Sequence, residues 1–185
     1  MDHKYSASLD NVRLRPLKKE DIEKLRMWRN DPDISRFLSP IPYITENMQE
    51  KWFEKYLLDP DEIIFAIEET DCLNRMVGSL SLYNFKDNEA EIGRIVVGDE
   101  SAHGMGIGKK AFLAAMALAF ERLKISIIKC SVHRENYSAR HIYFSIGFRA
   151  VGEHDFVNGG IEDELKIVKT VFEKDNPQVR KISFI

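Results

Sequence analysis

The residues best suited to chemistry stand in the stretch 104–110 (GMGIGKK), where three glycines lie within five positions and two lysines follow. The apolar run before it, 92–97 (IGRIVV), is typical of a buried strand, and the apolar run after it, 111–123, is typical of a helix. Glycine lets the backbone turn sharply and lets an anion approach the main chain. The free N–H groups and the dipole of a first helical turn attract that anion. The stretch therefore predicts a site for the pyrophosphate of a nucleotide-like cofactor, with Lys109 and Lys110 adding positive charge.

Three kinds of glycine loop bind such groups, and their spacings differ. A P-loop requires Gly, four residues, Gly-Lys and then Ser or Thr, but His103 and Lys110 stand at the first and last of these positions. A dinucleotide-binding turn is matched only loosely, by Gly106, Gly108 and Ala111, and the acidic residue expected about 20 positions later is missing. The third kind is the turn of acyl-CoA-dependent N-acetyltransferases. The stretch 103–108 (HGMGIG) resembles the pattern Arg/Gln-x-x-Gly-x-Gly/Ala of the GNAT superfamily, with His103 where Arg or Gln is usual. The alternative is a plain turn before a helix.

A second motif, at 136–148 (NYSARHIYFSIGF), resembles the GNAT pattern Asn-x-x-Ala-x-x-x-Tyr-x-x-x-Gly-Phe. The two motifs come in the order usual in the family, with room for a helix and a strand between them. The resemblance extends over residues 12–172 and is clearest over 90–148. On these motifs the chain is identified as a member of the GNAT superfamily, in a branch similar to ribosomal-protein N-terminal and amino-sugar acetyltransferases. The resemblance implies the GNAT fold and acetyl-CoA as the cofactor.

Acetyl transfer to an amine requires that the amine lose a proton, that the thioester carbonyl be polarised and that the leaving thiolate be protonated or stabilised. By resemblance, the Tyr143 hydroxyl lies near the cofactor sulfur and is the candidate acid; the alternative is an aromatic side chain that only packs. Glu91 is the candidate base, directly or through water, and its alternative is a solvated charge at a strand end. Asn136 is implied to contact the pantetheine arm, but it also suits the N-cap of a helix, and both roles can hold together.

The resemblance also implies which residues contact the cofactor and the acceptor. In the family, the strand before the glycine turn diverges from its neighbour, and its free main chain pairs with pantetheine amides. The implied cofactor-binding residues are Ile95, Val96, Val97, His103, Gly104, Met105, Gly106, Ile107, Gly108, Lys109, Asn136 and Tyr143. The candidate acceptor-binding residues are Trp28, Arg29, Asn30, Phe37, Tyr43 and Arg94. Arg94 is unusual in an apolar strand and suits an acidic or phosphate-bearing substrate, although it could equally pair with a carboxylate such as Glu91.

Composition limits the class of protein. The chain has 185 residues, of which 44% are hydrophobic and 31% charged, as is ordinary for one globular domain. A formal net charge of −3 argues against general binding to nucleic acid. Cys72 and Cys130 are too few for a disulfide framework and fit no zinc pattern, so we expect free thiols in the cytoplasm and no metal site. The N-terminus lacks the apolar core of a signal peptide, and no apolar run approaches the ~18 residues of a membrane span.

The elements that must position these residues are predicted from periodicity and turn signals. Helices are expected at 20–30, between Thr45 and Asp59, at 106–124 and at 138–146; strands are expected at 11–17, 63–67, 77–85, 90–97, 125–132, 148–154 and 164–172. The crossover from 90–97 to 125–132 through a helix should make those two strands parallel. With the family resemblance, the expected fold is mixed α/β, with a mostly antiparallel central sheet, one parallel, splayed strand pair and flanking helices. Residues 1–185 are expected to form a single acetyltransferase domain with peripheral tails at 1–10 and 174–185.

These observations predict an enzyme that moves an acetyl group from acetyl-CoA directly to the primary amine of a small molecule. An amino sugar, a nucleotide-linked amino sugar or a polyamine would suit. The first alternative is a protein or peptide N-terminus as the acceptor. The second is a non-catalytic CoA-binding or interaction module on the same fold. We expect a monomer or homodimer with no nucleic-acid or membrane partner.

Overall fold

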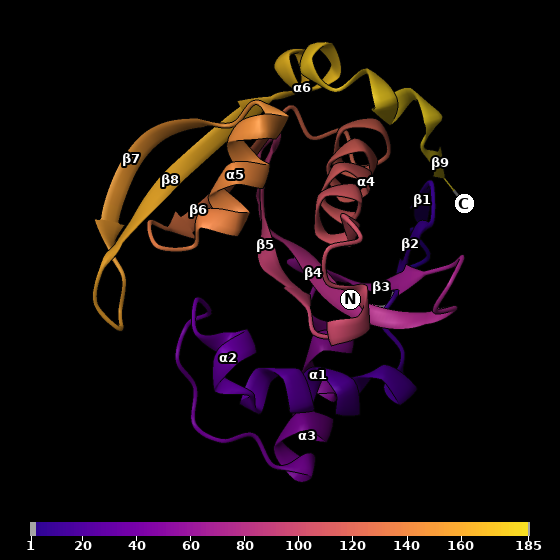
Figure 1. The fold of residues 1–185 in the computed structure, drawn as a ribbon, viewed down its shortest axis with the longest axis vertical. Helices are drawn as coiled ribbons and strands as arrows, with labels where there is room; N and C mark the ends of the chain where they lie inside the picture. The colour runs from indigo at the N-terminus through magenta and orange to yellow at the C-terminus, as the bar shows by residue number, and fades with distance from the viewer. Residues whose placement is uncertain (1–2, 185) are drawn as a thin grey trace.

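The computed structural model describes residues 3–184 and contains one nine-stranded sheet, in the order β7-β8-β6-β5-β4-β3-β2-β1-β9 (Figure 1). The strands are β1 (Ala7–Leu9), β2 (Val12–Pro16), β3 (Glu62–Glu69), β4 (Arg75–Lys86), β5 (Glu89–Val97), β6 (Ile127–His133), β7 (Arg149–Asp155), β8 (Ile161–Val168) and β9 (Ser183–Phe184). The helices are α1 (Ile22–Asn30), α2 (Pro32–Ser35), α3 (Glu46–Leu58), α4 (Ile107–Glu121), α5 (Tyr137–Ile146) and α6 (Lys169–Asp175). Short 3₁₀ turns occupy Lys19–Asp21, Glu100–Ala102 and Pro177–Lys181. The mixed, mostly antiparallel α/β fold predicted from the sequence is confirmed.

Alternating side chains of the central strands supply two separate hydrophobic cores, one on each face of the sheet. In β3, Ile63, Phe65 and Ile67 belong to the main core with α4 and α5. Ile64 and Ala66 belong to a smaller core with α1 and α3. Figure 1 shows α1, α2 and α3 gathered at one end of the molecule, away from α4. The strand periodicity of two therefore fixes which helices cover which face.

Helix α4 is the centre of the main core. Residues 111–120 are all buried, so this helix is apolar on every side, as a helix enclosed by protein must be. It is 15 residues long. No helix among residues 3–184 is long and apolar enough to cross a membrane.

Strands β5 and β6 are the parallel pair predicted from the crossover through α4. They are paired only from Glu89 with Ile127 to Glu91 with Lys129. Every other neighbouring pair of strands is antiparallel. Beyond Glu91 the two strands diverge, so the main chain of β5 on that side has no strand partner. The divergence opens the sheet beside the N-terminus of α4.

A bulge interrupts β5 where it passes this opening. Ser79 pairs with Val96 and Ser81 with Gly93, so two residues of β5 stand opposite one residue of β4. The bulge includes Arg94, which has a left-handed backbone with φ of 51°. Such a conformation costs on the order of 1–3 kcal/mol for a residue other than glycine. The bulge redirects the side chains of β5 at the opening.

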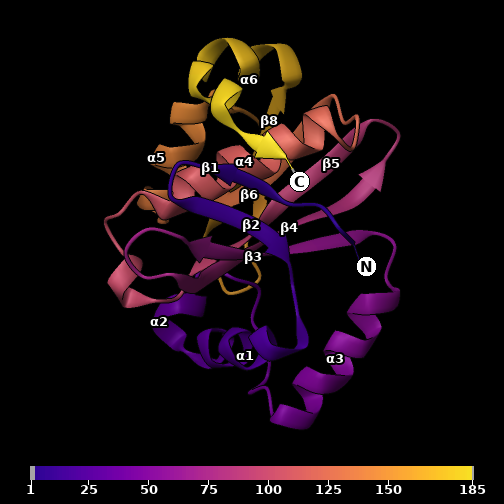
Figure 2. The ribbon, with the colours of Figure 1, turned by 90° about the vertical axis from the view of Figure 1, so that its right-hand side faces the viewer.

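Two sequence predictions are corrected at the ends of the chain. The strand predicted at 164–172 ends at Val168, and α6 begins at Lys169, because the β-branched residues before Phe172 suit either structure. The peripheral tails predicted at 1–10 and 174–185 contribute β1 and β9, which pair with each other at the sheet edge (Figure 2). The strands are short, three and two residues, so they carry little periodicity to detect. Residues 1, 2 and 185 lie outside the described part.

Candidate active site

A large cleft with a volume of about 1370 Å³ opens where β5 and β6 diverge. One wall is β5 after Glu91 together with the glycine turn, which we define as residues 103–109. The opposite wall is the end of β6 with the start of α5. Residues of α1 and of the loop after it, 34–44, close the remaining side. The cleft therefore joins the two sequence motifs to the N-terminal third of the chain.

The glycine turn leads into α4 in a conformation that favours glycine. Gly104 and Gly106 have φ of 78° and 72°, and a Cβ at either position would meet no atom within 4 Å. Their identity is thus required by the backbone and not by packing. Gly106 is the N-cap of α4 and provides no side chain, so the N–H groups of the first turn stay available. Space, free donors and a helix dipole converge here, as an anion site requires.

The charged and polar residues of the turn point in different directions. Lys109 lines the cleft and donates to the Ser145 hydroxyl of α5 at 3.0 Å. Lys110, predicted beside the anion, instead donates to Asn11 Oδ1 at 2.6 Å, away from the cleft. The exposed His103 ring lies 2.9 Å from the Val97 carbonyl and ties the turn to the end of β5. Met105 packs against the main core and does not line the cleft. The positive charge at the turn therefore comes from Lys109 and not from Lys110.

Two further predicted cofactor contacts border the opening. Ile95, Val96 and Val97 line the cleft along the unpaired edge of β5. Asn136 lines it from the start of α5, where it is the N-cap and accepts from the Ala139 N–H at 3.2 Å. The capping alternative for Asn136 is thus seen directly, and its place in the cleft leaves a cofactor contact open as well.

Tyr143 projects from α5 between the core and the cleft. Its ring stacks on Phe112 with centroids 4.6 Å apart, and the residue is 5% exposed. No described residue forms a hydrogen bond with its hydroxyl. The hydroxyl oxygen is nevertheless not fully buried, and because Tyr143 lines the cleft, we infer that this oxygen opens into it. Burial, with smaller contributions from Cys130 and Tyr83, raises the pKa of Tyr143 well above its ordinary value. The hydroxyl is therefore protonated at neutral pH and available as a donor.

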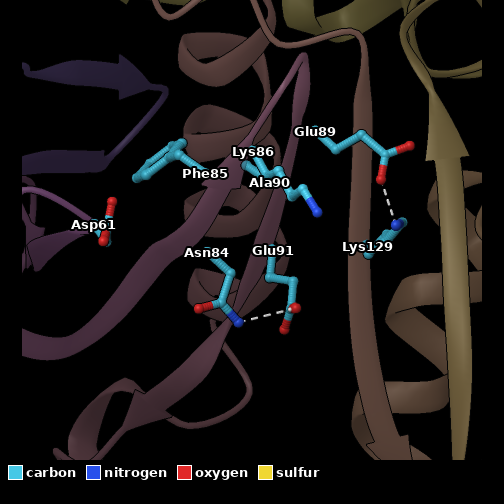
Figure 3. A pocket seen from close by; sticks show the side chains of 8 residues that line it. All are labelled: Asp61, Asn84, Phe85, Lys86, Glu89, Ala90, Glu91 and Lys129. Atoms are coloured by element: carbon cyan, nitrogen blue, oxygen red, sulfur yellow. Dashed lines mark hydrogen bonds and ion pairs between the residues drawn. The ribbon is translucent and has the colours of Figure 1, made fainter.

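Glu91 lies outside this cleft. It faces a separate hollow of about 340 Å³, and its Oε1 accepts from Asn84 Nδ2 at 3.0 Å (Figure 3). Figure 3 also shows the neighbouring ion pair of Glu89 with Lys129. The structure thus does not bring the candidate base together with Tyr143 in one cavity.

Tyr83 of β4, a residue that sequence reasoning missed, lies directly opposite Glu91 in the sheet. It lines the cleft, and a Cβ on Gly93 would lie 2.8 Å from its hydroxyl. Burial, followed by the nearby Glu91 carboxylate, raises the pKa of Tyr83 to about 12. The Arg94 guanidinium lies 4.2 Å from the centroid of its ring. An alternating strand offers no local signal that a Tyr will border a site, which is why the sequence did not reveal it.

The candidate acceptor-binding residues divide into two groups. Trp28, Arg29, Phe37 and Arg94 line the cleft. Trp28 also packs against Gly98, where a Cβ would overlap its ring.

Asn30 and Tyr43 do not line the cleft. The Asn30 amide exchanges hydrogen bonds with the main chain of Ile44, at 2.8 and 2.9 Å, and so fixes the loop to α1. Tyr43 is 69% exposed. Asn30, at the end of α1, and Tyr43, in the loop, therefore border the cleft without lining it.

Three rings from distant segments form a wall on the acceptor side: Phe37, which the sequence predicted, and His133 and Phe156, which it did not. His133 lies 5.3 Å from Phe37 and 5.2 Å from Phe156, measured between ring centroids, and all three line the cleft. The Glu135 N–H donates to His133 Nδ1, so Nε2 carries the hydrogen and faces the Gly159 carbonyl at 3.2 Å. This bridge connects the loop after α1 to the β7–β8 hairpin.

The residues present fit a CoA-like cofactor. The free N–H groups of α4 and Lys109 would hold a pyrophosphate, and the open space at Gly104 and Gly106 admits it. The unpaired edge of β5 would hold the amide-containing arm.

The comparisons with known proteins give the same result. The family model described as "Acetyltransferase (GNAT) domain" matches residues 11–149. Spermidine N(1)-acetyltransferase of Escherichia coli K12 is 28% identical over 165 residues, covering 86% of each chain. Acetyltransferase PseH of Campylobacter jejuni is 24% identical and covers 69% of this chain and 76% of that protein.

A solved structure, spermidine N-acetyltransferase from Vibrio cholerae in complex with CoA and spermine, aligns with a TM-score of 0.79 at 22% identity. That alignment covers 88% of this chain and 98% of the other and shows that the fold is shared. The family match, the relatives and the two sequence motifs agree. The chain belongs to the GNAT acetyltransferase family and is an acetyl-CoA-dependent acyltransferase.

Proposed function

We propose that this enzyme acetylates the primary amine of a small molecule and that Tyr143 is its general acid. The observation that carries the proposal is the Tyr143 hydroxyl, which opens into a cleft with the glycine turn on one wall and acceptor-side residues on another. The relatives named above include spermidine N-acetyltransferases, which supports an amine of low molecular weight. Polyamines and amino sugars are the candidate classes.

Different residues of the chain bind the cofactor and donate the proton. Bound acetyl-CoA supplies a thioester, whose acetyl group is transferred and whose sulfur leaves as a thiolate. The first turn of α4 and Lys109 hold the anionic end of the cofactor, and the edge of β5 orients its arm. Tyr143 is protonated at neutral pH, as a phenol with a pKa of about 10 already is, so its hydroxyl can donate a hydrogen bond and then a proton to the leaving sulfur. No side chain forms a covalent intermediate in this scheme.

We propose that water in the cleft, and not Glu91 directly, takes the proton of the attacking amine. Glu91 accepts from Asn84 in the neighbouring hollow, and its cross-strand partner Tyr83 is the residue that lines the cleft. Tyr83 has a pKa of about 12, so it stays protonated and is a poor base near neutral pH. The Glu91 carboxylate acts from behind Tyr83 by favouring positive charge in the cleft.

The wall of Phe37, His133 and Phe156 favours a small acceptor over a peptide. These rings connect the loop after α1 with the β7–β8 hairpin and so narrow the acceptor side. A peptide N-terminus would need a continuous groove for several residues. The two free cysteines, Cys130 buried and Cys72 exposed, suit a reducing compartment, and we propose the cytoplasm.

The test is acetylation of an amine panel, followed by mass spectrometry of the products. The panel should contain amino sugars, their phosphates, polyamines and short peptides. We expect acetylated small amines and inert peptides. Acetylated peptides beside inert small amines would reverse the proposed substrate class, and CoA binding with no acetylated amine of any class would point to a binding module.

A further inference from the structure

Two arginines face the acceptor side of the cleft. Arg29 stands in the last turn of α1, and Arg94 stands on the bulge of β5. Both line the cleft. Because they come from segments far apart in the chain, only the folded structure brings them into one cavity.

Arg29 has no carboxylate partner. Its guanidinium donates to the Ser39 carbonyl, and no Asp or Glu among the described residues lies within ion-pair distance of it. The C-terminus of α1 contributes only a partial negative charge, on the order of half a unit. Burial and then the charge of Arg94 lower the pKa of Arg29 from its ordinary value. The guanidinium is thus a half-buried cation that no carboxylate among residues 3–184 neutralises through an ion pair.

Arg94 is held in position but only partly neutralised. Its backbone has φ of 51°, its guanidinium lies 4.2 Å from the centroid of the Tyr83 ring, and Glu62 forms an ion pair with it. The two arginines carry two positive charges and Glu62 carries one negative charge, and the other acidic residue that lines the cleft, Glu162, lies on the β7–β8 hairpin beside His154. Guanidinium groups bind phosphate and carboxylate oxygens strongly, so an arginine without a carboxylate partner near a second arginine suits an anionic ligand.

The remaining carboxylates do not suit a polycation. Among the residues lining the cleft, the acidic side chains are Glu62 and Glu162. Glu62 is paired with Arg94, and Glu162 accepts from His154 at 3.1 Å. An acceptor with several ammonium groups would therefore meet two arginines before it met a carboxylate without a partner.

We propose that the acceptor amine carries an anionic group, a phosphate or a carboxylate, that binds between Arg29 and Arg94. This inference rests on the proposed function and specifies its acceptor. Arg29 is the residue that recognises the anion directly, because its donors lack a carboxylate partner, whereas Arg94, which is paired with Glu62, adds charge from β5. The planar guanidinium fork suits both phosphate and carboxylate oxygens.

The experiment compares amines in pairs that differ in one anionic group. Ethanolamine with O-phosphoethanolamine and glucosamine with glucosamine 6-phosphate test phosphate, propylamine with β-alanine tests carboxylate, and spermidine tests a polycation. The measured quantity is the ratio of kcat/KM within each pair, for the parent enzyme, Arg29→Gln and Arg29→Lys. Arg180→Gln is the matched control, because it removes an equal charge from the exposed C-terminal 3₁₀ helix.

We expect at least one anionic amine to exceed its neutral partner by ~10-fold or more, as one charge-assisted hydrogen bond allows. Arg29→Gln should abolish most of that ratio, Arg29→Lys should keep part of it, and Arg180→Gln should leave it unchanged. CoA affinity, measured by calorimetry for each variant, reports whether the cofactor side is intact.

Ratios near one in the parent enzyme, a preference for spermidine, or a ratio unchanged in Arg29→Gln would overturn this inference and leave the proposed function standing. A chain that binds CoA but acetylates none of these amines would overturn both. The phosphate and carboxylate pairs are read separately, so a preference in one of them alone identifies the source of the anion.

Discussion

One side of the cleft presents mainly main-chain groups, and the other presents mainly side chains. Most of the cofactor side is one continuous segment, 92–109, whose useful groups are mainly main-chain atoms: the unpaired edge of β5, the glycine turn and the N–H groups of α4. The acceptor side is assembled from α1, the loop after it, β4, the bulge of β5 and the β7–β8 hairpin, and it presents side chains. Main-chain atoms recognise a cofactor independently of most side chains, whereas recognition of the acceptor depends on which side chains are present.

This difference explains why one side carries motifs and the other does not. A glycine with positive φ or a helix N-terminus requires particular residue types at neighbouring positions, so it can be recognised in the local sequence. A cation such as Arg29, which meets Arg94 only through the fold, leaves none. Substitutions should therefore separate the two sides: backbone changes should affect cofactor affinity, and side-chain changes should affect turnover or acceptor choice.

The largest effect is expected on the cofactor side, from Gly106→Asp. The φ of 72° at Gly106 disfavours any residue with a Cβ, and a carboxylate beside the first turn of α4 repels phosphate. We expect CoA affinity to fall about 100-fold or more, measured by calorimetry. Gly159→Asp is the control, since Gly159 has φ of 91° and equally open surroundings but lies in the β7–β8 hairpin. Unchanged CoA binding in Gly106→Asp would put the pyrophosphate elsewhere.

Tyr143→Phe should affect turnover and spare binding. The substitution removes only the hydroxyl that opens into the cleft and keeps the stacking on Phe112. If that hydroxyl protonates the leaving sulfur, kcat should fall ~10²-fold while the Kd of CoA stays level. Steady-state kinetics with any accepted amine, with chemistry shown to limit the rate, checks this.

Tyr56→Phe is the matched control for the loss of a hydroxyl. The Tyr56 hydroxyl accepts from the Ile64 N–H at 3.1 Å in the smaller core, so its removal should lower stability by ~1 kcal/mol without changing turnover. Normal kcat in Tyr143→Phe would assign Tyr143 to packing and leave protonation of the thiolate to water.

A smaller effect is expected from Glu91→Gln, because Glu91 lies in the neighbouring hollow and not in the cleft. We expect kcat/KM to fall by less than ~10-fold, below the usual contribution of a general base. The fall of kcat/KM at low pH, which is the acid limb of the pH profile, should be the same as in the parent enzyme. Glu89→Gln, a change of the same charge two residues earlier on β5, serves as the control. A loss of ~10²-fold together with the loss of the acid limb would make Glu91 the base after all.

The smallest effect is expected at Asn136, where a cap and a cofactor contact can be separated. Asn136→Ala removes the acceptor for the Ala139 N–H and should lower the free energy of unfolding by ~1 kcal/mol, or about 2–4 °C in Tm. Asn136→Ser keeps a capping oxygen and should restore Tm. If the amide also contacts the cofactor, the Ser variant should still bind CoA several-fold more weakly, by about one hydrogen bond. Parent-like CoA affinity in Asn136→Ser would leave Asn136 with the capping role alone.

Much of the fold was predictable because its signals are local. The helix of α3 begins after Thr45, whose hydroxyl accepts from the Met48 N–H at 3.3 Å, as the sequence predicted. Strands predicted at 148–154 and 164–172 correspond to β7 and β8, which Gly159 and Gly160, both with positive φ, join in an antiparallel pair. The prediction was wrong at 169–172, where a β-branched sequence is helical, and at the two tails, where β1 and β9 stabilise each other by pairing across the whole chain.

The candidate site divides along the same line. The sequence by itself determined the glycine turn, the helix it begins and the Asn136 and Tyr143 motif, because each depends on backbone geometry or helical spacing within a few residues. Only the tertiary structure decided that Glu91 faces Asn84, that Lys110 turns to Asn11, and that Asn30 fixes a loop instead of facing the acceptor. Only the tertiary structure brought Tyr83, Arg29 and Arg94 to one cavity. The direction of these side chains depends on a bulge and on contacts between distant segments, and neither can be predicted from the local periodicity of the sequence.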